Sequence, residues 1–292
     1  MTDGSASSSQ RKPLSPLAIA VTLMALAVGI MLWAEGSPGR TIRLAPPWSD
    51  GELSRYVVMR SGSVDESIGH AEIGIRVQGD ATSLVFDYAE PGFSKRSEVT
   101  AETYGLLPSR TIIQRESSEG GIAAITAVYH SAEGAASPQR SSPQAGSPQG
   151  TVQGTLQSTP GTPRISAADV EVVGARGIES ARRDLEGNVR WDTEEMMHVI
   201  RALPLKERFR ASFDVFDPAN AAQYSVVVQV TSVETMSTPS GEFRCWRVDV
   251  EGLGMRVWVA VEYPYQLVSF ELVNRRTVGM LTHYVIGGGT DP

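Results

Sequence analysis

The chain has almost no cysteine: Cys245 is the only one among 292 residues. A disulfide within the chain is therefore excluded. No cysteine lies close to the N-terminal apolar stretch, which argues against a lipoprotein anchor. Cys245 itself falls in the strand-like stretch 242–250, where we expect a small buried hydrophobic side chain rather than a reactive thiol.

Positive charge is also scarce. Lys and Arg number 26 against 33 Asp and Glu, which gives a net charge of −7. The charges of residues 1–36 cancel, so the whole excess belongs to the part of the chain that follows. Because an acidic surface repels a phosphate backbone, we expect no nucleic acid among the partners.

Sequence motifs that carry chemistry are missing as well. The histidines His70, His130, His198 and His283 are far apart and show none of the spacings of a metal site. The chain contains no nucleophile elbow, Walker loop or dinucleotide fingerprint. We therefore predict a non-enzymatic protein with no catalytic residues, no cofactor and no metal site.

One long apolar run is present near the start of the chain. Leu14 to Ala34 carries no charge and follows directly after Arg11 and Lys12. At about 1.5 Å of rise per residue, such a helix reaches about 30 Å, the thickness of the hydrocarbon core of a bilayer. We predict a single transmembrane anchor at 14–35, preceded by a cytoplasmic tail at 1–13.

A cleaved signal peptide is the alternative to this anchor, because residues 34–36 form a weak small-x-small site. The polar start at 1–10 is longer than most signal peptides need, which favours a retained anchor. Positive charges immediately before the apolar run favour an inner-membrane protein whose C-terminal domain lies on the periplasmic side. Ala18, Ala25 and Gly29 would then give the helix a small-residue face for packing.

Beyond a linker at 36–47, the chain reads as one β-domain at 48–286, followed by a tail at 287–292. Short runs rich in β-branched and aromatic residues are separated by turn residues, as in an antiparallel meander. Leu84, Phe86 and Tyr88, for instance, share one face of their strand. We expect strands at 55–60, 68–77, 83–88, 111–114, 122–130, 224–233, 242–250, 255–262, 267–273 and 278–285.

The stretch 131–167 interrupts this pattern. It is rich in Ser, Pro, Gly and Gln, contains no aromatic residue, and cannot bury a core. It could link two domains or form a long loop. We predict a disordered loop within one domain, because neither flank alone resembles a closed sheet.

A helix is expected at 193–202. Asp192 is a good N-cap, Glu195 completes a capping-box pair, and Pro204 ends the helix. Its apolar face needs a cover, and packing against the sheet is the simpler purpose. A methionine-lined ligand groove is the alternative, and we name Met196, Met197, Ile200 and Trp258 as candidate contacts for a ligand or partner.

Three stretches carry a resemblance to a known family. They are WDTEEMMHVIRALPL at 191–205, TPSGEFRC at 238–245 and VWV at 257–259. The chain resembles the bacterial envelope family catalogued as domain of unknown function thirty-one-oh-eight, over most of 48–284. It departs from the family at Lys206-Glu207, where members often have a glycine, and in the Ser-Pro-Gln-rich insertion. The resemblance implies an extracytoplasmic β-rich domain and supplies no catalytic residues.

The family's shape is similar to that of lipoprotein carriers, which have a curved antiparallel sheet closed by helices. We therefore expect a mainly β protein, with one N-terminal transmembrane helix and a curved antiparallel sheet or half-barrel packed on a short helix. Its expected function is that of a structural or interaction subunit that braces a complex of membrane protein subunits. The alternative is a module that binds a lipid or another apolar ligand in the concavity of the sheet.

Overall fold

A computed structural model gives the structure of the chain and describes residues 44–62, 66–132, 153–155, 163–175 and 177–287. This part is mainly β, with one short α-helix, α2 (Met196–Ala202), and one 3-10 turn, η1 (Val273–Arg275). None of its helices is both long and apolar enough to cross a membrane. The predicted anchor at 14–35, with Ala18, Ala25 and Gly29, lies outside the described residues.

The described strands join in a single 16-stranded sheet. The chain up to residue 184 supplies β1 (Leu53–Arg60), β2 (Ser67–Gln78), β3 (Ala81–Glu90), β4 (Phe93–Glu102), β5 (Pro108–Ser117), β6 (Gly121–Ser131), β7 (Gln153–Thr155), β8 (Ile165–Gly174) and β9 (Gly177–Asp184). The chain after residue 184 supplies β10 (Val189–Asp192), β11 (Arg210–Asp217), β12 (Ala222–Thr238), β13 (Gly241–Glu251), β14 (Met255–Ala260), β15 (Leu267–Leu272) and β16 (Thr277–Val285).

Two antiparallel meanders meet where the first strand pairs with the last. The order across the sheet is β10-β11-β12-β13-β14-β15-β16-β1-β2-β3-β4-β5-β6-β8-β9, with β7 beside β11. In the joining pair, Val57 lies opposite Met280. Among the strand pairs of the described residues, only those that β11 forms with β10 and with β7 are parallel. Strands on both sides of the 131–167 segment therefore belong to the same sheet.

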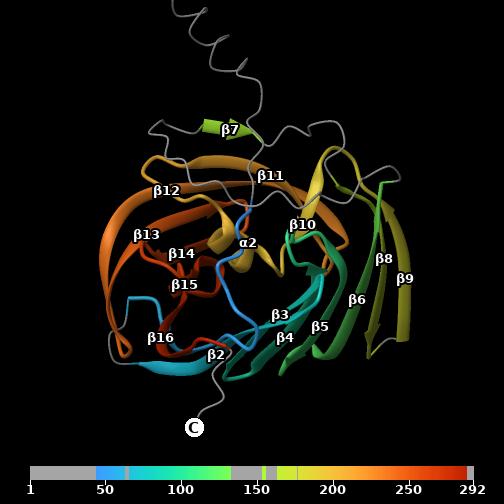
Figure 1. Cartoon of the computed structure of the whole chain (residues 1–292). Helices are drawn as coiled ribbons and strands as arrows, with labels where there is room; N and C mark the ends of the chain where they lie inside the picture. Colours follow the sequence, from blue (N-terminus) through green and yellow to red (C-terminus); the bar gives the residue numbers. More distant parts are fainter. Residues whose placement is uncertain (1–43, 63–65, 133–152, 156–162, 176, 288–292) are drawn as a thin grey trace, which may run out of the picture. The chain divides into compact units, whose positions relative to one another are not determined.

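The sheet curves around α2 without closing (Figure 1). Its two terminal strands, β10 and β9, do not pair with each other in the described part of the chain. Side chains of β10 instead reach the opposite meander, where the indole nitrogen of Trp191 donates to the carbonyl oxygen of Gly105 at 3.4 Å. The structure thus confirms the expected curved antiparallel sheet packed on a short helix.

Alternation along the strands places the main hydrophobic core on the face that surrounds α2. Leu84, Phe86 and Tyr88 are buried there, as their period-two spacing predicted. Val257 and Val259 belong to the same core, whereas Trp258, between them, points to the other face of the sheet and joins a small separate cluster. At the turn between β2 and β3, Gly79 has a φ of 64°, which favours glycine.

The bounds of the helix and of the segment 131–167 are among those that differ from the sequence prediction. The helix begins at Met196 rather than at 193, because Asp192 ends β10 and the next three residues form a turn. Described strands enter the range 131–167 of the predicted loop at three places, since β6 includes Ser131, β8 begins at the buried Ile165, and β7 pairs with β11. Residues 133–152 and 156–162 lie outside the described part.

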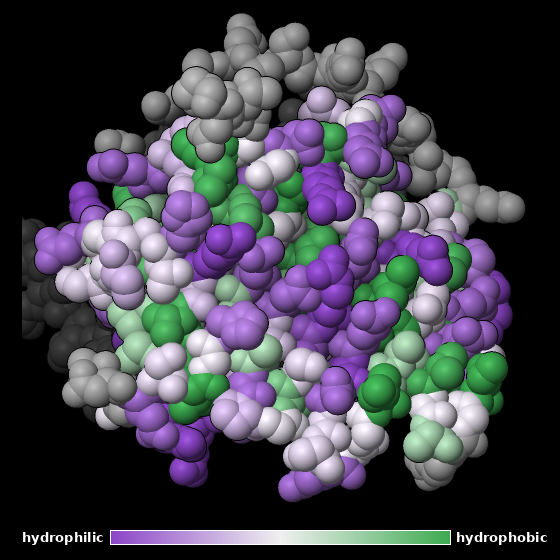
Figure 2. Space-filling view, turned by 90° about the horizontal axis from the view of Figure 1, so that it is seen from below, coloured by the Kyte–Doolittle hydropathy of each residue, from purple (hydrophilic) through white to green (hydrophobic). Residues whose placement is uncertain are grey.

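The face seen from below is mixed in character (Figure 2). Hydrophilic residues cover much of its centre, and hydrophobic residues are scattered among them. Scattered apolar residues are normal for a surface in contact with water.

Candidate functional site beside helix α2

The N-terminus of α2 is fixed by two acidic side chains. Oδ1 of Asp192 accepts hydrogen bonds from the backbone N–H groups of Glu194 and Glu195, at 2.8 and 3.1 Å. Oε1 of Glu195 accepts one in return from the backbone N–H of Asp192, at 3.1 Å. The two side chains form the reciprocal bonds expected of a capping box, but the N-cap of the helix is Glu195 rather than the predicted Asp192.

The other carboxylate oxygen of Asp192 connects α2 to the opposite side of the sheet. It accepts hydrogen bonds from the hydroxyl of Tyr129, at 2.8 Å, and from that of Thr111. Burial raises the pKa of Asp192 to about 6. Burial and then the charge of Asp192 raise the pKa of Glu195 well above its ordinary value. These bonds hold the start of the helix against β5 and β6.

The C-terminal end of α2 is fixed by Arg201. Its Nη1 lies 2.6 Å from Oε1 of Glu52, and both side chains are almost completely buried. Its Nε donates to the carbonyl oxygen of Tyr265 at 3.0 Å, and its Nη2 donates to that of Pro264 at 3.3 Å. Arg201 therefore joins α2 to the segment before β1 and to the loop between β14 and β15.

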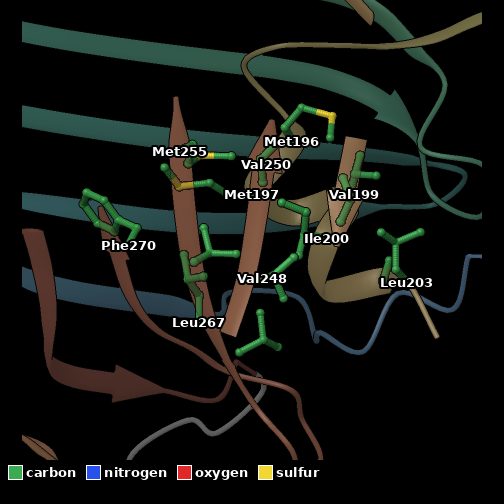
Figure 3. Packing of buried hydrophobic residues seen from close by; sticks show 14 of the residues in the cluster. Met196, Met197, Val199, Ile200, Leu203, Val248, Val250, Met255, Leu267 and Phe270 are labelled. Atoms are coloured by element: carbon green, nitrogen blue, oxygen red, sulfur yellow. The ribbon is translucent and has the colours of Figure 1, made fainter. Parts of the chain in front are cut away.

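A cavity of about 330 Å³ opens between α2 and the sheet. Met197 and Met255 lie side by side at this place, with Phe270 close by (Figure 3). One part of the wall is apolar, and Phe86, Phe93, Met197, Leu253, Met255 and Leu272 form it. Because both ends of α2 are anchored, this apolar wall is held in place by the protein.

Charged side chains line the rest of the cavity. Lys95 and Glu194 form an ion pair at 2.6 Å. The guanidinium of Arg275 lies 3.5 Å from the ring centroid of Phe93, and it also pairs with Glu90. Arg115 has a buried Nε with no hydrogen-bond partner in the described part of the chain. The cavity thus combines apolar and charged surfaces.

His198 is the unusual residue of this cavity. Its side chain lines the cavity, is only 2% exposed, and has no hydrogen-bond partner at either ring nitrogen among the described residues. Trp48 meets it edge-on, with the ring centroids 6.1 Å apart. Burial, and then the charge of Arg201, lowers the pKa of His198 to about 3. The imidazole is therefore neutral at physiological pH.

A second, larger depression of about 660 Å³ lies over β2 to β6. It is more open, and its large apolar or aromatic lining residues are only Ile122 and Tyr88 in the described part of the chain. Asp87 and Arg96, which line it, already form an ion pair at 2.5 Å. The cavity beside α2 therefore offers the better place for an apolar ligand.

The structure does not bring the four predicted contact residues together. Met197 lines the cavity, but Met196 and Ile200 are fully buried in the main core. Trp258 is also buried, and its indole nitrogen donates to Oε2 of Glu234 at 3.1 Å. It packs with Cys245 in the cluster on the other face, because alternation along β14 directs it away from α2.

Several residues of the cavity were not predicted from the sequence. His198 was considered only as a metal ligand, and no group of three metal-ligating side chains occurs in the described residues. The sequence signal that could have identified His198 is its position within an otherwise apolar helix. Lys95 belongs to β4, a strand that the sequence pattern did not reveal.

The family model described as "Protein of unknown function (DUF3108)" matches residues 177–280. The predicted family resemblance is confirmed over this range. The DUF3108 match extends from β9 into β16, so it includes α2 and part of the cavity wall, with Met197, His198 and Leu253.

No curated protein matches the sequence. A solved structure that does match is the Aeromonas veronii immune modulator A, with 9% identity and a TM-score of 0.15. The alignment covers 81% of this chain and 74% of the other. A TM-score this low supports no statement about the DUF3108 region or the rest of the chain.

Proposed function

We propose that the β-domain is a non-enzymatic binding module for a single-chain apolar or amphiphilic molecule. The observation that carries this proposal is the cavity of about 330 Å³ beside α2, with its methionine and aromatic wall. Ligand sites are typically concave, mostly apolar and largely pre-formed. This cavity is pre-formed, because both ends of α2 are anchored.

Cavity size and charge narrow the class of ligand. Small-molecule sites occupy roughly 300–1,000 Å³, so this cavity falls at the lower end of that range. One alkyl chain suits such a volume better than a molecule with two chains. Methionine side chains adapt to irregular apolar ligands, and a polar end would meet the ion pairs that Lys95 forms with Glu194 and Arg275 forms with Glu90.

The test is displacement of the fluorescent apolar probe phenylnaphthylamine from the purified protein by n-octanol. Leu253→Trp adds bulk to a half-buried wall position and should weaken probe binding at least about tenfold, which corresponds to about 1.4 kcal/mol. Ile178→Trp, at an exposed position on β9, is the matched control and should leave probe binding unchanged. Equal binding by both variants, or no binding to the parent protein, would refute the proposal.

A second proposal retains the role of an interaction subunit that braces a membrane complex. It is supported by β9, a terminal strand of the sheet whose side chains are mostly exposed and include Ile178, 68% exposed. Such an edge can accept a strand from a partner. A set of membrane subunits that co-purifies with the protein, and is lost in Ile178→Lys but kept in Val273→Lys, would support it.

The proposed location follows from the sequence. We propose that residues 14–35 hold the protein in the inner membrane as a single-pass anchor, with the β-domain on the periplasmic side. Full-length protein should then resist alkaline extraction of membranes, whereas a chain that starts at residue 39 should be released. Release of both would contradict the anchor.

A further inference from the structure

His198 lacks the partners that a buried polar side chain normally has. Both ring nitrogens are unpartnered within the described residues, although most buried polar atoms in folded proteins are hydrogen-bonded. Leaving such a group unpaired costs free energy, because water has been removed and nothing replaces it. The side chain also lines the cavity, and although both ring nitrogens are covered by protein, a molecule held in the cavity would lie against the imidazole.

Neither the guanidinium of Arg201 nor the carbonyl of Glu195 is free to pair with His198, and the indole nitrogen of Trp48, whose ring packs against it, also has no partner among the described residues. The guanidinium of Arg201 is bonded to Glu52 and to two carbonyl oxygens of the β14–β15 loop. The backbone carbonyl of Glu195 accepts the main-chain N–H of His198, so it is part of the helix. Apolar side chains form much of the remaining cavity wall. The cavity is therefore the place from which a partner for His198 can come.

The form of the imidazole limits that partner. Arg201, which lies one helical turn away, disfavours a second positive charge, and burial acts in the same direction. A neutral imidazole offers one donor and one acceptor. An uncharged hydroxyl can donate to one of these nitrogens or accept from the other, whichever carries the proton.

We propose that His198 determines specificity in this cavity by hydrogen-bonding an uncharged hydroxyl group on an alkyl-chain ligand. This inference rests on the proposed function and adds the chemical class of the ligand. In this arrangement the alkyl chain of the ligand lies against Met197 and Met255. The ligand's hydroxyl replaces the water that His198 lost on folding.

The experiment compares n-octanol with n-octyl chloride, a matched chain that lacks the hydroxyl. Both displace phenylnaphthylamine from the purified protein and from His198→Phe, which keeps a ring of similar size without its nitrogens. The preference for octanol over octyl chloride should be about tenfold greater in the parent protein than in the variant. The octanol preference of the parent protein is divided by that of the variant. This ratio cancels the different water solubilities of the two ligands.

His198→Leu serves as a second variant, and thermal unfolding shows whether each variant is folded. An equal preference in the parent protein and in whichever variant is folded would overturn the role of His198 while leaving the binding module intact. Failure of both ligands to displace the probe from any protein would overturn the proposed function itself. A lost preference with retained binding of octyl chloride is the result that supports the inference.

Discussion

Arg201 and Glu52 form an almost completely buried ion pair, with Nη1 and Oε1 2.6 Å apart, although 149 residues separate them along the chain. One residue ends α2 and the other directly precedes β1. The pair therefore joins the helix to the place where the two meanders of the sheet meet.

Removing one member of this pair should be strongly destabilising. In Arg201→Met, the carboxylate of Glu52 stays buried without its counter-charge, and we expect a loss of about 3–5 kcal/mol in the free energy of unfolding. Arg55→Met is the control, because its pair with Glu72, at 2.9 Å, is exposed and should contribute at most about 1 kcal/mol. Urea denaturation measures both variants, and losses of similar size would contradict the buried pair's importance.

A close approach between two strands gives the second prediction. Gly279 on β16 lies opposite Phe270 on β15, and a methyl group at Gly279 would come within 2.3 Å of the phenyl ring. Gly279→Ala should therefore cost about 1–3 kcal/mol through overpacking. Gly74→Ala is the matched control, since its nearest contact would be an ordinary 3.8 Å.

Calorimetric melting temperatures of the two glycine variants provide the measurement. Phe270→Leu should relieve part of the strain, so the double variant should be more stable than the sum of the single losses predicts. Strict additivity of the two changes would show that the ring and the glycine do not interact.

The sequence predicted β3 and β14, whose buried faces alternate clearly, but it missed β8, β10 and β11, although these strands also bury large apolar residues. It did not predict β4, because the buried side chains of that strand include Ser97 and Ala101, which are small or polar. It also did not predict β9, whose side chains are almost all exposed. Residues 177–184 form a strand because they pair with β8. The pattern of residues within β9 cannot reveal that pairing.

The site was less accessible to sequence reasoning than the fold. Helical spacing identified the apolar face of α2 and so placed Met197 beside the sheet. The neighbours of His198 and Arg201 depend on contacts between distant segments, such as the one with Glu52. The alternation of β14 was visible, but only the curvature of the sheet decides that Trp258 faces away from the helix.

Asp192 should make stability depend on pH. Its pKa is about 6 in the folded protein and about 4 when exposed, so folding favours the protonated form. The contribution of Asp192 to the free energy of unfolding is fully present below pH 4. It falls by about 2–3 kcal/mol as the pH rises through 6. Asp192→Asn keeps an oxygen for the helix N–H groups and should remove this part of the decline.

Chemical denaturation between pH 3.5 and pH 7 measures the difference between the two proteins, and parallel curves would contradict the shift.

His198 acts in the opposite direction, because its pKa is lowered to about 3. Its contribution is present above pH 6.5 and is lost as the pH falls through 3. His198→Phe should therefore gain stability relative to the parent protein at pH 4.

Cys245 should resist alkylation while the protein is folded. The side chain is fully buried, and burial followed by the charge of Glu234 raises the pKa of the thiol to about 12. Because the thiolate is the reactive form, iodoacetamide must wait for the protein to open. If the local opening costs about 5 kcal/mol, the reaction should be about 5,000-fold slower in the folded protein than in urea. Ser240→Cys in a Cys245→Ser background puts the thiol at an exposed turn and should react equally fast in both conditions, so a similar rate for native Cys245 would show that its strand opens freely.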